Sequence, residues 1–168
     1  NSNLYFDETN TRMVMNFRNN YARLAESLFQ KGENRKAIET LDKCMAEFSG
    51  DVAKFSYFSI SLVDLYYKLG EKEKGNQLLG RMINNHLSEI KYLKEFDRGS
   101  GVNQKINITR QVLGSLAQII ETYKLEDASF TYTYNGDQFY KENNGEKEEI
   151  NKNTYMINTF RNELRSIQ

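Results

Sequence analysis

Two side chains, His86 and Cys44, have the chemistry of a catalytic base and a nucleophile, and each is the only residue of its type. His86 follows two asparagines in a predicted helix, and no Ser or Cys stands in a nucleophile motif. We therefore interpret it as a surface residue. Cys44 lies on an apolar helix face, where a small core residue is the usual occupant. With a single Cys and a single His, this sequence can form neither an internal disulfide nor a metal cluster held by several thiolates. The sequence predicts no catalytic residue, no metal site and no cofactor.

Three glycines, Gly32, Gly70 and Gly75, could in principle form a phosphate-binding loop. They are separated by helical sequence, so we interpret them as helix ends and close helix contacts instead. The 23 basic and 23 acidic residues cancel, which disfavours a nucleic-acid partner. Without a run of about 18 apolar residues, the chain is not expected to insert into a membrane.

The elements that would position any binding residue are helices. The stretches "QKGENRKAIETL" from Gln30 and "KLGEKEKGNQLL" from Lys68 have nearly the same pattern of residue types, and their glycines, Gly32 and Gly70, are 38 residues apart. Each glycine can adopt the left-handed conformation that ends a helix, so each stretch predicts the turn of a helical hairpin. The first helix is expected to bury a stripe at spacings of three and four residues, formed by Phe17, Tyr21, Leu24, Ala25 and Leu28.

The two hairpins are similar to tetratricopeptide repeats, which pair two antiparallel helices in about 34 residues. Small residues stand where the helices would cross, at Ala37 and Gly75. The usual proline after the second helix is absent, and four extra residues separate the units. A third, degenerate hairpin is predicted, because a solenoid needs roughly three units to bury its faces.

The third hairpin is expected to contain an insertion over residues 125–147. Within it, 128–147 alternates aromatic and polar residues and carries Asn135-Gly136, a favoured two-residue hairpin turn. A small β-hairpin and disorder are both compatible with this composition. The helix after it is predicted to begin near Glu148.

The predicted fold class is all-α, as a right-handed, tetratricopeptide-like solenoid of three hairpins in one domain over residues 1–168. Its parts are an extended lead-in (1–13), repeat 1 (14–50), repeat 2 (54–98) and repeat 3 (104–168).

In tetratricopeptide folds the first helix of each unit lines the concave groove. That geometry predicts a groove of carboxylates, amides and aromatic rings suited to a peptide, a partner segment or a sugar. Packing of Tyr57, Ile60 and Tyr67 against the third hairpin is an equally weighted alternative. The predicted groove residues are Asn19, Ala22, Glu26, Phe29, Tyr57, Ile60, Asp64 and Tyr67.

The run "NLYFDETNTRMVMNFRNNYARLAESLFQKGENRKAIETLDKCM", followed by "DLYYKLGEKEKGN", is more specific than a generic repeat. It resembles the C-terminal soluble region of a Bacteroidetes family of uncharacterised multi-spanning membrane proteins. That family is similar to protein O-mannosyltransferases and other glycosyltransferases of the C superfamily. The resemblance covers about residues 3–98. Its most telling residues are Arg18, Asn19 and Asn20, and Asn16 and Arg23 belong to the same motif.

The resemblance implies that the chain is a fragment whose catalytic membrane region lies upstream. It further implies a periplasmic location and a partner- or acceptor-binding role without catalysis in this part. The alternative is an independent soluble adaptor, cytoplasmic in that case, that binds a peptide segment in the groove. An enzyme acting alone is the least supported hypothesis.

Overall fold

The computed structural model describes residues 8–50, 53–96 and 99–166, and these are mostly helical. The helices are α1 (Glu8–Gln30), α2 (Asn34–Glu47), α3 (Ile60–Lys68), α4 (Lys72–Leu93), α5 (Ser100–Thr122) and α6 (Lys152–Ser166), with a 3₁₀ turn, η1 (Tyr57–Ser59), before α3. A sheet of three antiparallel strands, β1 (Thr131–Asn135), β2 (Gln138–Asn143) and β3 (Glu146–Ile150), lies between α5 and α6 in the chain. None of the helices in the described ranges combines the length and apolar composition needed to cross a bilayer.

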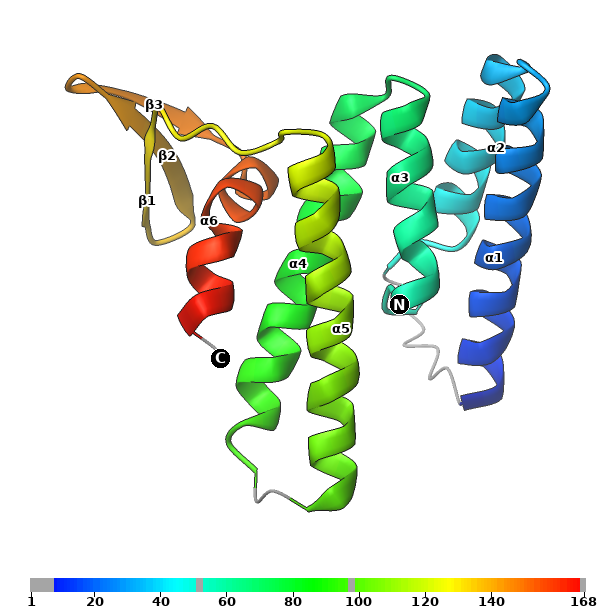
Figure 1. Cartoon of the computed structure of the whole chain (residues 1–168), viewed down its shortest axis with the longest axis horizontal. Helices are drawn as coiled ribbons and strands as arrows, with labels where there is room; N and C mark the ends of the chain where they lie inside the picture. The colour runs from blue at the N-terminus through cyan, green and yellow to red at the C-terminus, as the bar shows by residue number, and fades with distance from the viewer. Residues whose placement is uncertain (1–7, 51–52, 97–98, 167–168) are drawn as a thin grey trace, which may run out of the picture. The chain divides into compact units, whose positions relative to one another are not determined.

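The chain divides into two compact units, Asn1–Gly75 and Asn76–Gln168. In the first unit α1 and α2 lie side by side as an antiparallel pair (Figure 1) and α3 packs against both. The predicted helical content is confirmed, and so is the pairing of the two helices on either side of Gly32. The right-handed solenoid, which concerns how repeats stack on one another, remains a prediction, as does the division into three repeats.

The repeated stretches do form the same turn. Gly32 has φ +75° and Gly70 has φ +82°. In both, the residue after the glycine donates its N–H to a carbonyl five residues back, Glu33 to Leu28 and Glu71 to Tyr66, each at 2.9 Å. The glycine N–H bonds the carbonyl three residues back, which completes a Schellman motif. The prediction that both glycines end helices is correct.

The buried face of α1 differs from the predicted stripe. Phe17 and Leu24 are 43% and 52% exposed, and the face that packs inward carries Val14, Arg18, Ala22 and Ala25. Phe17 still contacts an aromatic ring, since it stacks on Phe48 with ring centroids 5.1 Å apart. The prediction is correct for Ala25 and wrong for Phe17 and Leu24, because a pattern of apolar residues alone does not include a buried arginine.

Arg18 is 1% exposed, and its guanidinium binds four backbone carbonyls. Nε donates to Phe48 O at 2.9 Å, and Nη2 donates to Ser49 O at 2.7 Å and Ala53 O at 2.6 Å. Nη1 donates to Lys54 O at 3.1 Å. The Phe55 ring covers the group, with its centroid 4.5 Å from Cζ. The guanidinium therefore satisfies carbonyls left open where α2 ends and joins α1 to the segment before η1.

In the second unit α4 and α5 are antiparallel neighbours (Figure 1), and Thr109 and Lys105 of α5 lie 3.4 Å and 3.7 Å from Glu89 of α4. Their contact is apolar on both sides: the buried residues include Leu79, Met82 and Ile83 of α4 and Val112, Leu113 and Leu116 of α5, whereas Ile108 is 52% exposed. α6 packs closely on α4, because a Cβ placed on Gly80 would come within 2.7 Å of the Asn153 backbone.

The insertion forms a β-sheet, which confirms the first of the two alternatives for residues 128–147, strands instead of disorder. The sheet has three strands, one more than the predicted hairpin. Asn135 pairs with Gln138, so the first turn is Gly136-Asp137, one residue later than predicted. The second turn is Asn144-Gly145, whose φ values of 51° and 82° match a type I′ turn.

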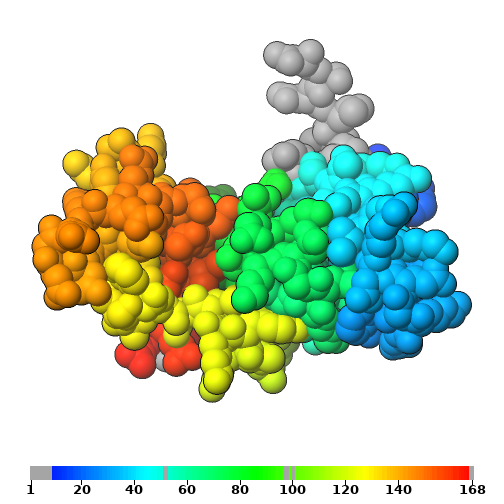
Figure 2. Space-filling view, turned by 90° about the horizontal axis from the view of Figure 1, so that it is seen from above, coloured from blue at the N-terminus to red at the C-terminus, as the bar shows by residue number. Residues whose placement is uncertain are grey.

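The predicted start of the last helix at Glu148 is wrong. Glu148 lies in β3 opposite Lys141, with which it forms an ion pair at 2.8 Å, and α6 begins at Lys152. Figure 2 shows the sheet, in orange, directly against α6. Tyr155 of α6 meets Tyr134 and Phe139 at ring-centroid distances of 5.8 Å and 5.0 Å, which gives the small sheet an aromatic contact that an isolated hairpin lacks.

We expect Arg18→Lys to lower the free energy of unfolding by about 2–4 kcal/mol, since an ammonium cannot bind four carbonyls in the guanidinium geometry. Chemical denaturation measures this. The matched control, Arg23→Lys on the exposed face of the same helix, should stay within about 0.5 kcal/mol of the parent. Equal effects of the two substitutions would contradict the role given to Arg18.

Gly80→Ala should destabilise the protein by about 2 kcal/mol, although alanine is the better helix former, because the methyl group meets the Asn153 backbone. The control is Gly114→Ala on the exposed side of α5, where nothing lies within 4 Å of the added methyl. It should stabilise by about 0.5–1 kcal/mol. Opposite shifts in thermal melting are the expected result, and a stabilising Gly80→Ala would disprove the close contact of α4 and α6.

Candidate functional site

A groove in the first unit lies between α1 and α3 and has a volume of about 340 Å³. We call it the α1–α3 groove. Its lining residues on α1 recur at intervals of one, three and four positions, which places them on one side of the helix. The lining is Asn19, Ala22, Arg23, Glu26, Ser27 and Gln30 from α1, with Ser61 and Leu65 from α3.

The groove has an apolar floor and polar walls. Ala22 and Leu65 are 4% and 1% exposed and form the floor. The walls carry an amide at Asn19, a guanidinium at Arg23 and a carboxylate at Glu26, which accepts a hydrogen bond from Gln30 at 3.3 Å. Amide and guanidinium groups at this spacing can donate hydrogen bonds to the carbonyls of an extended peptide. The amides can also accept hydrogen bonds from its N–H groups.

Part of the predicted groove therefore comes together. Asn19, Ala22 and Glu26 line the α1–α3 groove, and Arg23, selected with the family-like motif, lies beside them. Phe29 is half-buried and lies outside it.

The predicted residues of the second repeat lie elsewhere. Tyr57 is 57% exposed and meets Phe58 edge-on at 6.1 Å, outside the groove. Asp64 forms an ion pair with Lys68 at 2.8 Å. Tyr67 is 7% exposed and packs under Gly75, where an added Cβ would lie 2.9 Å from its ring. Ile60, also half-buried, is outside the lining.

The other motif residues differ in their surroundings. Arg18 is the buried residue described above, whereas Asn16 and Asn20 are exposed on α1. Four residues that line the α1–α3 groove were not predicted to do so: Ser27, Gln30, Ser61 and Leu65. The first two could have been found by continuing the spacing of Asn19 and Arg23, but the residues of α3 required its rotation about its axis to be known.

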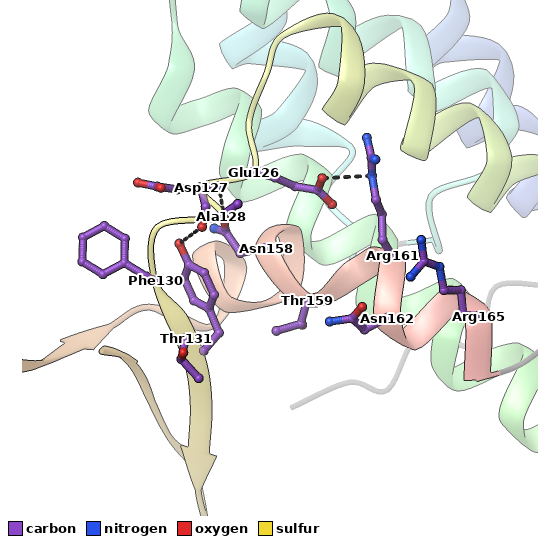
Figure 3. Close-up of a pocket in the computed structure, with 11 residues that line it drawn as sticks. Glu126, Asp127, Ala128, Phe130, Thr131, Asn158, Thr159, Arg161, Asn162 and Arg165 are labelled. Atoms are coloured by element: carbon purple, nitrogen blue, oxygen red, sulfur yellow. Dashed lines mark hydrogen bonds and ion pairs between the residues drawn. The ribbon is translucent and has the colours of Figure 1, made fainter. Parts of the chain in front are cut away.

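A second pocket, of about 420 Å³, lies in the other unit between α6 and the linker that joins α5 to β1 (Figure 3). We call it the α6 pocket. From the linker and β1 it is lined by Glu126, Asp127, Ala128, Phe130, Thr131 and Tyr132, and from α6 by Asn158, Thr159, Arg161, Asn162 and Arg165.

Hydrogen bonds and one ion pair fix the linker to α6. Arg161 Nε lies 2.9 Å from Glu126 Oε2, and the Asp127 N–H donates to Asn158 Oδ1 at 2.7 Å. Tyr132 donates its hydroxyl to the Asp127 carbonyl at 3.2 Å. The carboxylate of Asp127 accepts hydrogen bonds from the hydroxyl and N–H of Ser129, which lower its pKa. No sequence motif marked this pocket; the signal available was the spacing of Asn158, Arg161, Asn162 and Arg165 along one helix.

The two residues with catalytic side-chain chemistry are both buried. His86 is 7% exposed on α4, so the prediction that it is a surface residue is wrong. Its Nδ1 lies 3.5 Å from Glu89 Oε2. Cys44 is fully buried on α2, as expected, and burial raises its pKa to about 11. Among the described residues no three His, Cys, Asp or Glu side chains converge on a possible metal position.

Comparison of the chain with protein-family models, with curated proteins and with solved structures finds no significant match in any of the three. The family resemblance stated from the sequence therefore stays a prediction.

Cys44 should be nearly inert to thiol reagents in the folded protein. A shift of its pKa from 9.0 to about 11 lowers the thiolate fraction at neutral pH by about a hundredfold, and burial also blocks access. Reaction with a chromogenic disulfide should be at least about a hundredfold slower than in denaturant. A native rate close to the denatured rate would show that Cys44 is accessible.

Proposed function

We propose that this chain is a non-catalytic interaction domain that binds an extended peptide segment of a partner protein in the α1–α3 groove. The observation that carries the proposal is the row Asn19, Arg23 and Glu26 beside an apolar floor of Ala22 and Leu65. Such a row offers hydrogen bonds to a peptide backbone and an apolar surface for its side chains.

The arrangement proposed for the repeats is a right-handed, tetratricopeptide-like solenoid. It is supported by two hairpin turns closed by the same hydrogen bonds, at Gly32 and Gly70, 38 residues apart. The small residues that follow each turn, Ala37 and Gly75, keep the same separation and are both buried. A repeated unit of this kind places equivalent helices at equivalent positions.

The biological setting we propose is the periplasmic tail of a membrane glycosyltransferase-like protein, where the groove would hold an acceptor or partner protein beside an upstream membrane domain. Its support is the "NFRNNYARLA" segment and the second match at residues 64–76. The alternative setting is an independent adaptor. The reading frame on the 5′ side of the Asn1 codon separates the two, since only the first setting requires several apolar segments of about 20 residues there.

A peptide selected on the full chain from a random display library should lose about tenfold in affinity when Asn19 is changed to Ala, because two backbone hydrogen bonds are removed. The matched control is Asn20→Ala, the next residue of α1, which is exposed and outside the groove. Fluorescence polarisation gives both dissociation constants. Equal affinities for the Asn19→Ala and Asn20→Ala variants, or a library that yields no binder, would contradict binding in the α1–α3 groove.

A further inference from the structure

The charges that line the α6 pocket do not all have partners within it. Glu126 and Arg161 form an ion pair. The Asp127 carboxylate accepts from Ser129 and points away from α6 (Figure 3). Arg165 forms no ion pair or hydrogen bond with any residue of the described ranges. The charge that remains available to a ligand in this pocket is therefore positive.

Two guanidinium groups lie on the same side of the pocket. Arg161 uses Nε for Glu126, and its two terminal nitrogens form no hydrogen bond or ion pair with another side chain in the described part of the chain. Arg165 follows one helical turn after Arg161, so both guanidinium groups project from the same side of α6, whereas the amide of Asn162 lies nearer to Thr159 (Figure 3). A guanidinium presents paired N–H groups that match the two oxygens of a carboxylate.

Acceptor and hydroxyl groups also line the pocket. Glu126, from the linker, and Thr131, from β1, are part of the lining. Thr159 donates its hydroxyl hydrogen to the Tyr155 carbonyl at 2.9 Å, so its oxygen can only accept from a ligand. These groups suit ligand hydroxyls, and the volume of about 420 Å³ suits a small organic molecule.

We propose that the α6 pocket is a binding site for a small hydroxy acid, a molecule with one carboxylate and several hydroxyls. The carboxylate would bind Arg165 and the terminal nitrogens of Arg161, and Asn162 would donate a hydrogen bond to a ligand hydroxyl. The hydroxyls would face Glu126 and Thr131. This site belongs to the second unit and is independent of peptide binding in the α1–α3 groove.

The test is a titration of the full chain, followed by amide NMR, with D-glucuronate as the probe. D-glucose is the matched neutral compound, because it differs by a hydroxymethyl group in place of the carboxylate. Glucuronate should cause saturable shifts at the amides of Ala128, Thr131 and Asn162, and glucose should not. Inorganic phosphate, at equal concentration, should cause smaller shifts than glucuronate.

Two variants identify the site. Arg165→Gln should weaken glucuronate binding about tenfold through the loss of a charge-assisted hydrogen-bonding group. Arg110→Gln, an exposed arginine on α5 outside the pocket, should leave it unchanged. Equal shifts with glucose, tighter binding of phosphate, or equal affinities of the two variants would each overturn the proposal.

Discussion

The first unit depends on one interaction, the binding of four backbone carbonyls by the buried guanidinium of Arg18. Carbonyls at the end of a helix have no partner within it, and burying them unpaired is costly. By supplying five donors in a fixed plane, Arg18 allows the chain to leave α2 and turn toward α3 in the interior. It also fixes the rotation of α1, since Ala22 lies one turn further along the same buried face. Asn19 and Arg23, the residues immediately after these two, are thereby directed to the groove.

The sequence allowed the hairpin turns to be predicted because their cause is local. A glycine with positive φ and two short-range hydrogen bonds is sufficient to end α1 and α3, and both features act within six residues. The buried face of α1 could not be predicted in the same way. An apolar stripe that included Phe17 and Leu24 was the reasonable expectation, but the carbonyls that require Arg18 are 30 to 36 residues away. For the same reason only the α1 half of the groove was found.

The sheet shows a related limit. Alternation and an Asn-Gly pair made strands one of two alternatives for residues 128–147, the other being disorder. The third strand, β3, has the sequence "EKEEI", whose charges resemble a solvated turn. Its strand structure comes from neighbours: the Asn144-Gly145 turn, the Lys141–Glu148 pair and the packing of β1 and β2 on Tyr155. The low strand propensity of this charged segment is therefore outweighed by its pairing with β2. That pairing cannot be read from the sequence of the segment alone.

The α6 pocket, finally, depends on the way α5 ends. Lys124 has φ 50°, a left-handed conformation that is unfavourable for a residue with a Cβ, and it occupies the position that glycine holds after α1 and α3. Leu125 donates to the Ile120 carbonyl at 3.0 Å, so this end has the same closing bond. The contacts that follow can offset the strain, because the linker then meets α6 through Glu126–Arg161 and Asp127–Asn158. In each pocket, most of the polar residues come from one side of a single helix, α1 or α6. The second wall is a segment whose direction is set by Arg18 in the α1–α3 groove and by the left-handed residue Lys124 in the α6 pocket.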